Sequence, residues 1–229
     1  MPETSTRASL VRRVPRAVGG WIGSAPGTYL WLLVLAATSF VVARMNPARL
    51  HWFLAARSTN LDQLRSHPVH ALIASAIWTE QASFLSYFVL FTLFHANAER
   101  WLGTWRWFTV AATAHVGATF VSEGIVAWGI TSGRLHDSLA RTVDVGVSYA
   151  LAGVAAVLTY RFAGRLRWLY GGGVVVFYLV PLITSHTFTD LGHFCAVLIG
   201  LCFRPFARGR PTWDPGLLRQ WWRARRSGA

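Results

Sequence analysis

Ser148 and His193 are the two side chains whose types and positions most clearly suggest chemistry. Each lies near the start of an apolar segment, and charge placement puts both within about two helical turns of the outer membrane interface. At matched depth, an imidazole could take the hydroxyl proton while the serine oxygen attacks a carbonyl carbon. A serine in a membrane helix also serves as a hydrogen-bonding contact between helices. The pair alone therefore leaves a catalytic and a structural interpretation open.

The elements that would carry these side chains are six apolar segments. Most approach the ~20 residues that a bilayer-spanning helix needs, although the last is short. They cover residues 28–44, 82–98, 105–130, 143–162, 169–184 and 191–203. The stretch 46–79 is mixed in character, and its apolar piece at 71–78 is too brief to cross a bilayer. The sequence predicts an all-α, polytopic membrane bundle with six transmembrane helices.

Composition supports this class. Of the 229 residues, 53% are hydrophobic and only 14% are charged, and the apolar residues form long runs instead of one stripe per helix. The net charge of +13 could suggest nucleic-acid binding. Because the arginines lie between the apolar runs and at both termini, we expect anionic lipids at the cytoplasmic face as the partner, and no nucleic acid.

Arginine placement also predicts the topology. With the N-terminus inside, sixteen of the 22 arginines lie on the inner side and six on the outer side, so both termini are expected in the cytoplasm. Residues 1–26 would be a basic cytoplasmic arm, 27–205 the six-helix membrane domain and 206–229 a basic cytoplasmic tail. Leu217, Leu218, Trp221 and Trp222 could give that tail an apolar helical face on lipid. A disordered basic tail is the alternative.

Other polar groups within the apolar segments suggest structural roles. His95 is expected to be wetted near the inner interface, and His115 and Glu123 share a helix face suited to a hydrogen bond between helices. Asp144 and Asp190 are expected at the interface. We could assemble no metal site from these residues, and we expect neither a metal nor another cofactor.

Small residues accompany both candidate catalytic groups. Gly146 comes two residues before Ser148, and Gly192 comes directly before His193. Ala196 and Gly200 then follow at spacings of four, which lets helix backbones approach closely. We expect this packing to bring Ser148 within reach of His193.

The chain resembles the rhomboid family of intramembrane serine proteases. The segments that carry the resemblance are GVSY at 146–149, GHFCAVLIG at 192–200 and ERWLG at 99–103. They occur in the family's order and spacing within residues 50–203. The resemblance implies a six-helix core in which Ser148 is the nucleophile and His193 the general base. It also implies a divergent bacterial member, located as a multi-pass protein in the inner (plasma) membrane.

Several positions depart from the family pattern. Tyr149 follows the serine where the family has glycine, and Ser83 and Tyr87 stand where it has the histidine and asparagine that stabilise the oxyanion. Ala152 replaces an aromatic residue, and Ala196 replaces a glycine. The Trp-Arg pair of the family's first loop has no counterpart that we can place.

These departures leave two functions open. The first is a serine endopeptidase that cleaves transmembrane or juxtamembrane segments of membrane proteins through the Ser148/His193 dyad. Gly146, Ser83, Tyr87 and Tyr149 are then the candidates for oxyanion support. The second is a proteolytically inactive rhomboid-like protein that binds client membrane proteins or lipids.

Overall fold

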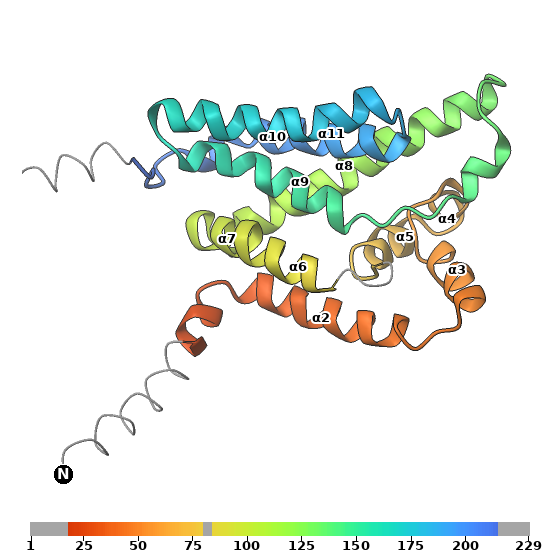
Figure 1. Ribbon diagram of the computed structural model, residues 1–229, viewed down its shortest axis with the longest axis horizontal. Helices are drawn as coiled ribbons and strands as arrows, with labels where there is room; N and C mark the ends of the chain where they lie inside the picture. The colour runs from red at the N-terminus through yellow and green to blue at the C-terminus, as the bar shows by residue number, and fades with distance from the viewer. Residues whose placement is uncertain (1–17, 80–83, 215–229) are drawn as a thin grey trace, which may run out of the picture.

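The computed structural model describes residues 18–79 and 84–214, and its regular structure there is helical (Figure 1). One isolated bridge joins Phe162 and Trp213. The α-helices are α2 (Pro26–Val42), α3 (Pro47–Ala55), α4 (Leu61–Ser66), α5 (Pro68–Ser75), α6 (Phe84–Leu90), α7 (Ala96–Leu102), α8 (Thr104–Thr131), α9 (Val147–Val157), α10 (Gly164–Thr184), α11 (Phe188–Cys202) and α12 (Arg204–Ala207). A π-helical segment η1 (Phe91–His95) joins α6 to α7, and 3-10 helices form η2 (Asp137–Arg141) and η3 (Leu158–Arg161).

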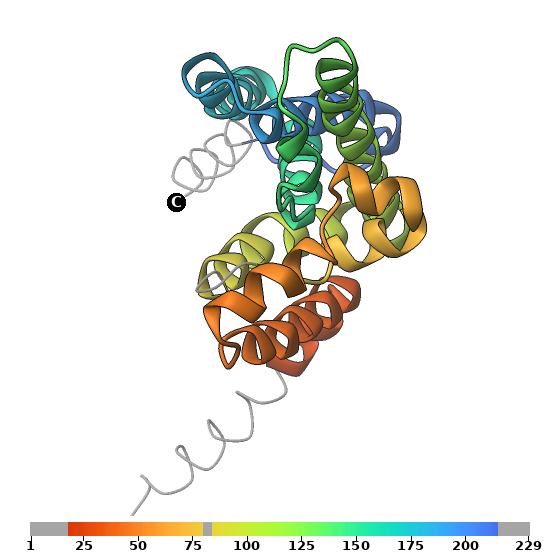
Figure 2. The same cartoon turned by 90° about the vertical axis from the view of Figure 1, so that its right-hand side faces the viewer.

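Helices α8, α9 and α11 pack against one another and form the centre of the bundle. Helix α10 lies along the outside of α11, while α6, η1 and α7 lie on the other side of α9 with α2 beyond them (Figures 1 and 2). The short helices α3, α4 and α5 gather at one end of the bundle (Figure 1). The candidate residues Ser148 and His193 therefore lie on two central helices.

The six predicted apolar segments are all largely helical, but their helices differ in length and hydropathy. Only α8 and α10, among the described residues, are long and apolar enough to cross a membrane. The others are interrupted or shorter: α2 has 17 residues and α11 has 15. Helix α9 begins at Val147, later than predicted, because the preceding chain pairs with another loop through Thr59 N–H and Asp144 O at 3.0 Å.

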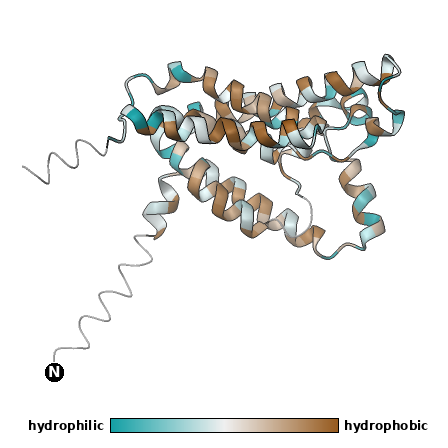
Figure 3. Cartoon of the chain, turned by 45° about the horizontal axis from the view of Figure 1, so that its top comes forward, coloured by the Kyte–Doolittle hydropathy of each residue, from teal (hydrophilic) through white to brown (hydrophobic). Residues whose placement is uncertain are grey.

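The outward surface of α10 is strongly apolar. Only Gly171 is buried along its 21 residues, while Trp168 is 79% exposed and Phe177 is 70% exposed. The hydropathy colouring shows apolar residues along the other long helices as well (Figure 3). Because an unpartnered apolar helix of this length is costly in water, we assign this surface to contact with lipid.

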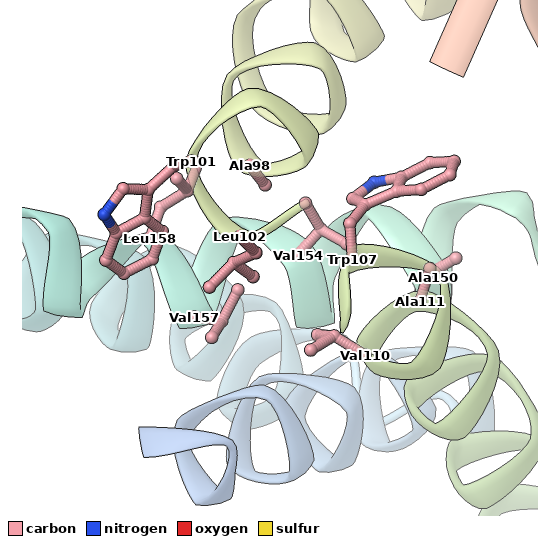
Figure 4. Packing of buried hydrophobic residues seen from close by; sticks show 10 residues of the cluster. All are labelled: Ala98, Trp101, Leu102, Trp107, Val110, Ala111, Ala150, Val154, Val157 and Leu158. Atoms are coloured by element: carbon pink, nitrogen blue, oxygen red, sulfur yellow. The ribbon is translucent and has the colours of Figure 1, made fainter. Parts of the chain in front are cut away.

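A buried cluster joins α7, α8 and α9 (Figure 4). Leu102 and Val110 pack with Val154 and Val157, and Trp101 and Trp107 belong to the same cluster. From α9 the cluster takes Ala150, Val154 and Val157, so it holds this helix from two residues after Ser148 to its C-terminal end.

The arginines divide unequally between the two ends of the bundle. The N-terminal ends of α2, α8 and α10 meet the C-terminal ends of α7, α9 and α11 at one end (Figure 1). Eight of the described arginines lie there, at positions 100, 106, 161, 165, 167, 204, 208 and 210, against six at the other end. The residues near 206–211 are tied to this end, because the Trp101 indole N–H donates to Pro211 O at 2.8 Å.

Candidate functional site

Helices α9 and α11 meet with backbone-to-backbone contact. A methyl group added at Gly200 would lie 2.2 Å from Gly153 O, and one added at Gly153 would lie 3.2 Å from Ala196 O. Such separations leave no room for a side chain at either glycine. The small residues of the sixth apolar segment thus lie in the helix interface, with Gly192, Ala196 and Gly200 all buried.

The residue of α9 that packs against the start of α11 is Tyr149. A methyl group added at Gly192 would lie 2.5 Å from the Tyr149 ring, and the ring centroids of Tyr149 and His193 are 5.0 Å apart, edge to face. The Tyr149 hydroxyl donates to Asp144 Oδ2 at 2.7 Å. Tyr149 is thus anchored at its hydroxyl while its ring contacts His193.

Ser148 and His193 are each partly exposed. In the part of the chain that the structure describes, no hydrogen bond joins these two side chains. The Ser148 hydroxyl donates instead to Val145 O, one turn earlier, at 3.4 Å. His193 lies between two aromatic rings, with the Tyr178 centroid 5.7 Å from its own. The side chain that the structure brings into contact with His193 from α9 is that of Tyr149.

Gly146 lies against α8. A methyl group added there would lie 2.1 Å from His115 Nδ1, so the imidazole occupies the space beside this glycine. His115 Nε2 lies 2.9 Å from Leu72 O and 3.4 Å from Ser75 Oγ, both on α5. Gly146 N–H donates to Ser75 O at 3.1 Å. These contacts fasten the start of α9 to α5 and α8.

The other two candidates for oxyanion support lie on the second apolar segment. Tyr87 belongs to α6, where its ring packs edge to face on Phe91 at 6.1 Å. Val147, at the start of α9, shares a buried cluster with Phe91 of η1, and Tyr87 packs against that cluster. Ser83 lies outside the described residues.

The ERWLG segment provides a structural anchor. The Glu99 carboxylate is buried and accepts hydrogen bonds from Gly27 N–H at 2.9 Å and from both Thr28 N–H and Thr28 Oγ1 at 2.7 Å. The Thr104 hydroxyl donates to it at 2.9 Å. A carboxylate thus satisfies the free amides at the start of α2 and holds that helix to the junction of α7 and α8.

One polar position, His95, differs from the interpretation made from sequence, and Asp144 has a partner that the sequence did not predict. His95 is fully buried, since Trp107 Nε1 donates to its Nδ1 at 3.1 Å and Phe91 stacks on it at 4.1 Å. The prediction of a wetted histidine was wrong because it ignored Trp107, which reaches His95 from α8, and Phe91, which covers it from the same π-helical segment. Asp144 is buried within the protein, where it accepts a hydrogen bond from the Tyr149 hydroxyl. That it lies at the level of the membrane interface stays a prediction.

A cavity on the other side of the central helices is separate from this site. An apolar pocket of about 550 Å³ lies between α2, α5 and α8, and neither Ser148 nor His193 lines it. Within the described parts of the chain, no group of three or more His, Cys, Asp or Glu side chains is arranged to hold a metal ion. Cys195 and Cys202 are free thiols.

The Tyr149–Asp144 pair is the feature that sequence reasoning missed. Asp144 precedes the helix and Tyr149 lies in its first turn, five residues later. This spacing could have suggested the contact between them. A tyrosine in place of the family's glycine indicated that something large occupied this position. It did not indicate that the ring would fill the gap left by Gly192.

Comparison with known proteins agrees with the motif order and the helical architecture. A family model described as a rhomboid-like protein matches residues 20–213. No curated protein and no solved structure gives a significant match. The family match spans α2 to α12 and includes the ERWLG, GVSY and GHFCAVLIG segments. The chain therefore belongs to the rhomboid-like protein family, and it is an integral membrane protein of that family.

Proposed function

We propose that this protein is an intramembrane serine endopeptidase in which Ser148 is the nucleophile and His193 the general base. The observation that carries the proposal is the contact of Tyr149, the residue next to Ser148, with the His193 ring at 5.0 Å. Since α9 and α11 are in backbone contact through Gly153 and Gly200, this contact indicates that the hydroxyl and the imidazole lie at the same level of two adjoining helices.

In the proposed reaction, His193 takes the Ser148 hydroxyl proton as Oγ attacks the scissile carbonyl carbon. The imidazolium then gives that proton to the leaving amine, and water hydrolyses the acyl-enzyme. Ser148 lies in the first turn of α9, where backbone N–H groups have no acceptor within the helix. The positive end of the α9 dipole supports use of the Ser148 N–H for the oxyanion.

The substrate of this reaction would be a transmembrane or juxtamembrane segment of another protein. The apolar outer surface of α10 supports entry from lipid, because a substrate helix could approach His193 past Tyr178 without crossing water. A helical backbone hides its carbonyls, so the segment must unwind locally before attack. Small helix-breaking residues in the substrate would favour this unwinding.

Labelling with a fluorophosphonate probe tests the proposal. The purified protein in lipid nanodiscs is compared with Ser148→Ala, His193→Ala and a control, Ser132→Ala. Ser132 follows α8, and its hydroxyl, like that of Ser148, donates to a carbonyl three residues earlier. We expect labelling of the unmodified chain and of Ser132→Ala, and a loss of about 10³-fold or more in the other two.

A non-proteolytic rhomboid-like protein that holds client membrane proteins is the second candidate. It is favoured by the direction of the Ser148 hydroxyl, which donates to Val145 O and not to His193. Equal background labelling in all four proteins, each monodisperse by size-exclusion chromatography, would reject the endopeptidase and favour this candidate.

A further inference from the structure

A second pocket, of about 330 Å³, lies at the arginine-rich end of the bundle, far along α9 from Ser148. It is formed by η1, α7, η3, the start of α10 and the segment that follows α12. Its lining combines one guanidinium and one amide with aromatic and aliphatic side chains, and comprises Leu93, Phe94, Asn97, Leu158, Arg161, Phe162, Tyr170 and Trp213.

The walls of this pocket are held in place by backbone contacts. Trp213 N–H donates to Arg161 O at 2.7 Å, and Ala163 N–H donates to Trp213 O at 3.1 Å. The Phe162 ring packs against Trp213 at 5.8 Å and against Tyr170 at 4.7 Å. The chain after α12 thus returns to η3 and closes one side of the pocket.

Arg161 supplies the charge. Its Nη1 donates to Asn97 O at 3.2 Å and to Asn97 Oδ1 at 3.4 Å, which orients the guanidinium within the pocket. Its Nε and Nη2 donors make no hydrogen bond to residues 18–79 or 84–214. A planar guanidinium with free donors is suited to bind a phosphate oxygen pair.

The charges and the apolar surface around the pocket indicate which class of ligand fits it. Glu99 is occupied at the start of α2, and Asp214 is the other carboxylate described at this end, against eight arginines. Leu93 is 54% exposed, so the apolar wall of the pocket continues into the outer surface of α6 and η1. A phosphate beside an arginine and a hydrocarbon chain along an apolar wall is the chemistry of a phospholipid.

We propose that this pocket binds one anionic phospholipid, with its phosphate on Arg161 and an acyl chain along Leu93 and Phe94. Bound there, the lipid fastens η3 and the segment after α12 to α7 at the membrane interface. The site is independent of Ser148 and His193, so it stands whether or not the chain is a peptidase.

Native mass spectrometry of the full chain in detergent tests this site. After delipidation, the protein is titrated with phosphatidylglycerol, or with phosphatidylcholine of the same acyl chains. We expect the unmodified chain to retain one phosphatidylglycerol in preference to phosphatidylcholine. Arg161→Gln should weaken that binding by about tenfold, since a charge-assisted hydrogen bond is lost. The control Arg208→Gln removes the same charge from an exposed position outside the pocket and should change it less than about twofold.

A photo-cross-linking experiment on a chain that keeps Arg161 tests the proposal even if the Arg161→Gln variant does not fold. A photoreactive benzoylphenylalanine at Leu93 should form an adduct with phosphatidylglycerol, and excess inorganic phosphate should not compete with it. Equal adducts with both lipids, or equal loss of binding in Arg161→Gln and Arg208→Gln, would overturn the proposal. Competition by inorganic phosphate would assign the site to a free anion and would also overturn it.

Discussion

Two carboxylates in this bundle are equally buried but differ in their hydrogen-bond partners. Glu99 and Glu123 are each 2% exposed. Glu99 accepts hydrogen bonds from α2 and α8, whereas Glu123 Oε2 has no partner among the described residues. Because a buried polar group costs free energy unless it is hydrogen-bonded, these residues should respond differently to the same substitution.

We expect Glu99→Gln to lower the apparent Tm in detergent by several degrees. The amide keeps the size of the side chain but loses the charge, and its NH2 group would face the Gly27 and Thr28 donors. Hydrogen bonds to charged groups contribute about 1.5–3 kcal/mol each. Glu123→Gln is the matched control and should change the apparent Tm by less than about two degrees. Equal losses in both variants would contradict the role given to the α2 amides.

At the scale of helices, the α9–α11 interface depends on glycines that admit a neighbouring backbone. Gly200→Ala would put a methyl group 2.2 Å from Gly153 O, and a backbone atom cannot move aside as a flexible side chain can. We expect a destabilisation of about 1–3 kcal/mol, measured as a lower apparent Tm. If the proposed peptidase is active, its rate should fall as well, since α9 and α11 carry Ser148 and His193.

Gly172→Ala provides the matched control for that variant. A methyl group added at Gly172, on the exposed helix α10, meets nothing within 4 Å. Alanine is favoured over glycine in a helix by about 1 kcal/mol, so this variant should unfold at the same or a higher temperature. A drop as large as that of Gly200→Ala would show that glycine flexibility matters more than packing.

The helices could be predicted from sequence, but their rotations could not. Residues 105–130 were predicted as an apolar helix and form most of α8, and residues 169–184 lie within α10. Successive residues of an α-helix lie about 100° apart around its axis, so the rotation of α9 decides whether Ser148 or Tyr149 faces α11. In water, hydrophobic periodicity would settle this rotation. In lipid, both the core face and the outer face are apolar, so the pattern carries little of that information.

The contacts around the candidate site could not be predicted from the sequence pattern either. Gly192 could be assigned to a close approach between helices, but its neighbour could not be named. The burial of His95 and the partner of Asp144 could not be predicted, because Trp107 reaches His95 from another helix and Tyr149 reaches Asp144 from the following turn. The motifs suggest candidate residues for such a site, whereas the packing around them is given only by the structure.

At the scale of the whole molecule, the two ends differ in charge, and that difference predicts the orientation in the membrane. Eight described arginines lie at the end that holds the segment after α12. The opposite end holds six arginines together with Asp62, Asp137 and Asp190. Since arginine near a helix end disfavours translocation, we predict the first end on the cytoplasmic side. The tail residues predicted to form an apolar helical face, 217–222, and most of the basic N-terminal arm lie outside the described residues.

Cysteine labelling in intact cells checks this orientation. Single cysteines are placed at Arg134→Cys, in the loop after α8, and at Arg208→Cys, after α12, in a chain whose Cys195 and Cys202 are replaced by serine. Each test variant removes one arginine, so the charge change is matched. A membrane-impermeant maleimide should label Arg134→Cys in intact cells and Arg208→Cys only after lysis. Labelling of Arg208→Cys in intact cells, with Arg134→Cys protected, would reverse the orientation and move the proposed phosphatidylglycerol pocket to the outer leaflet.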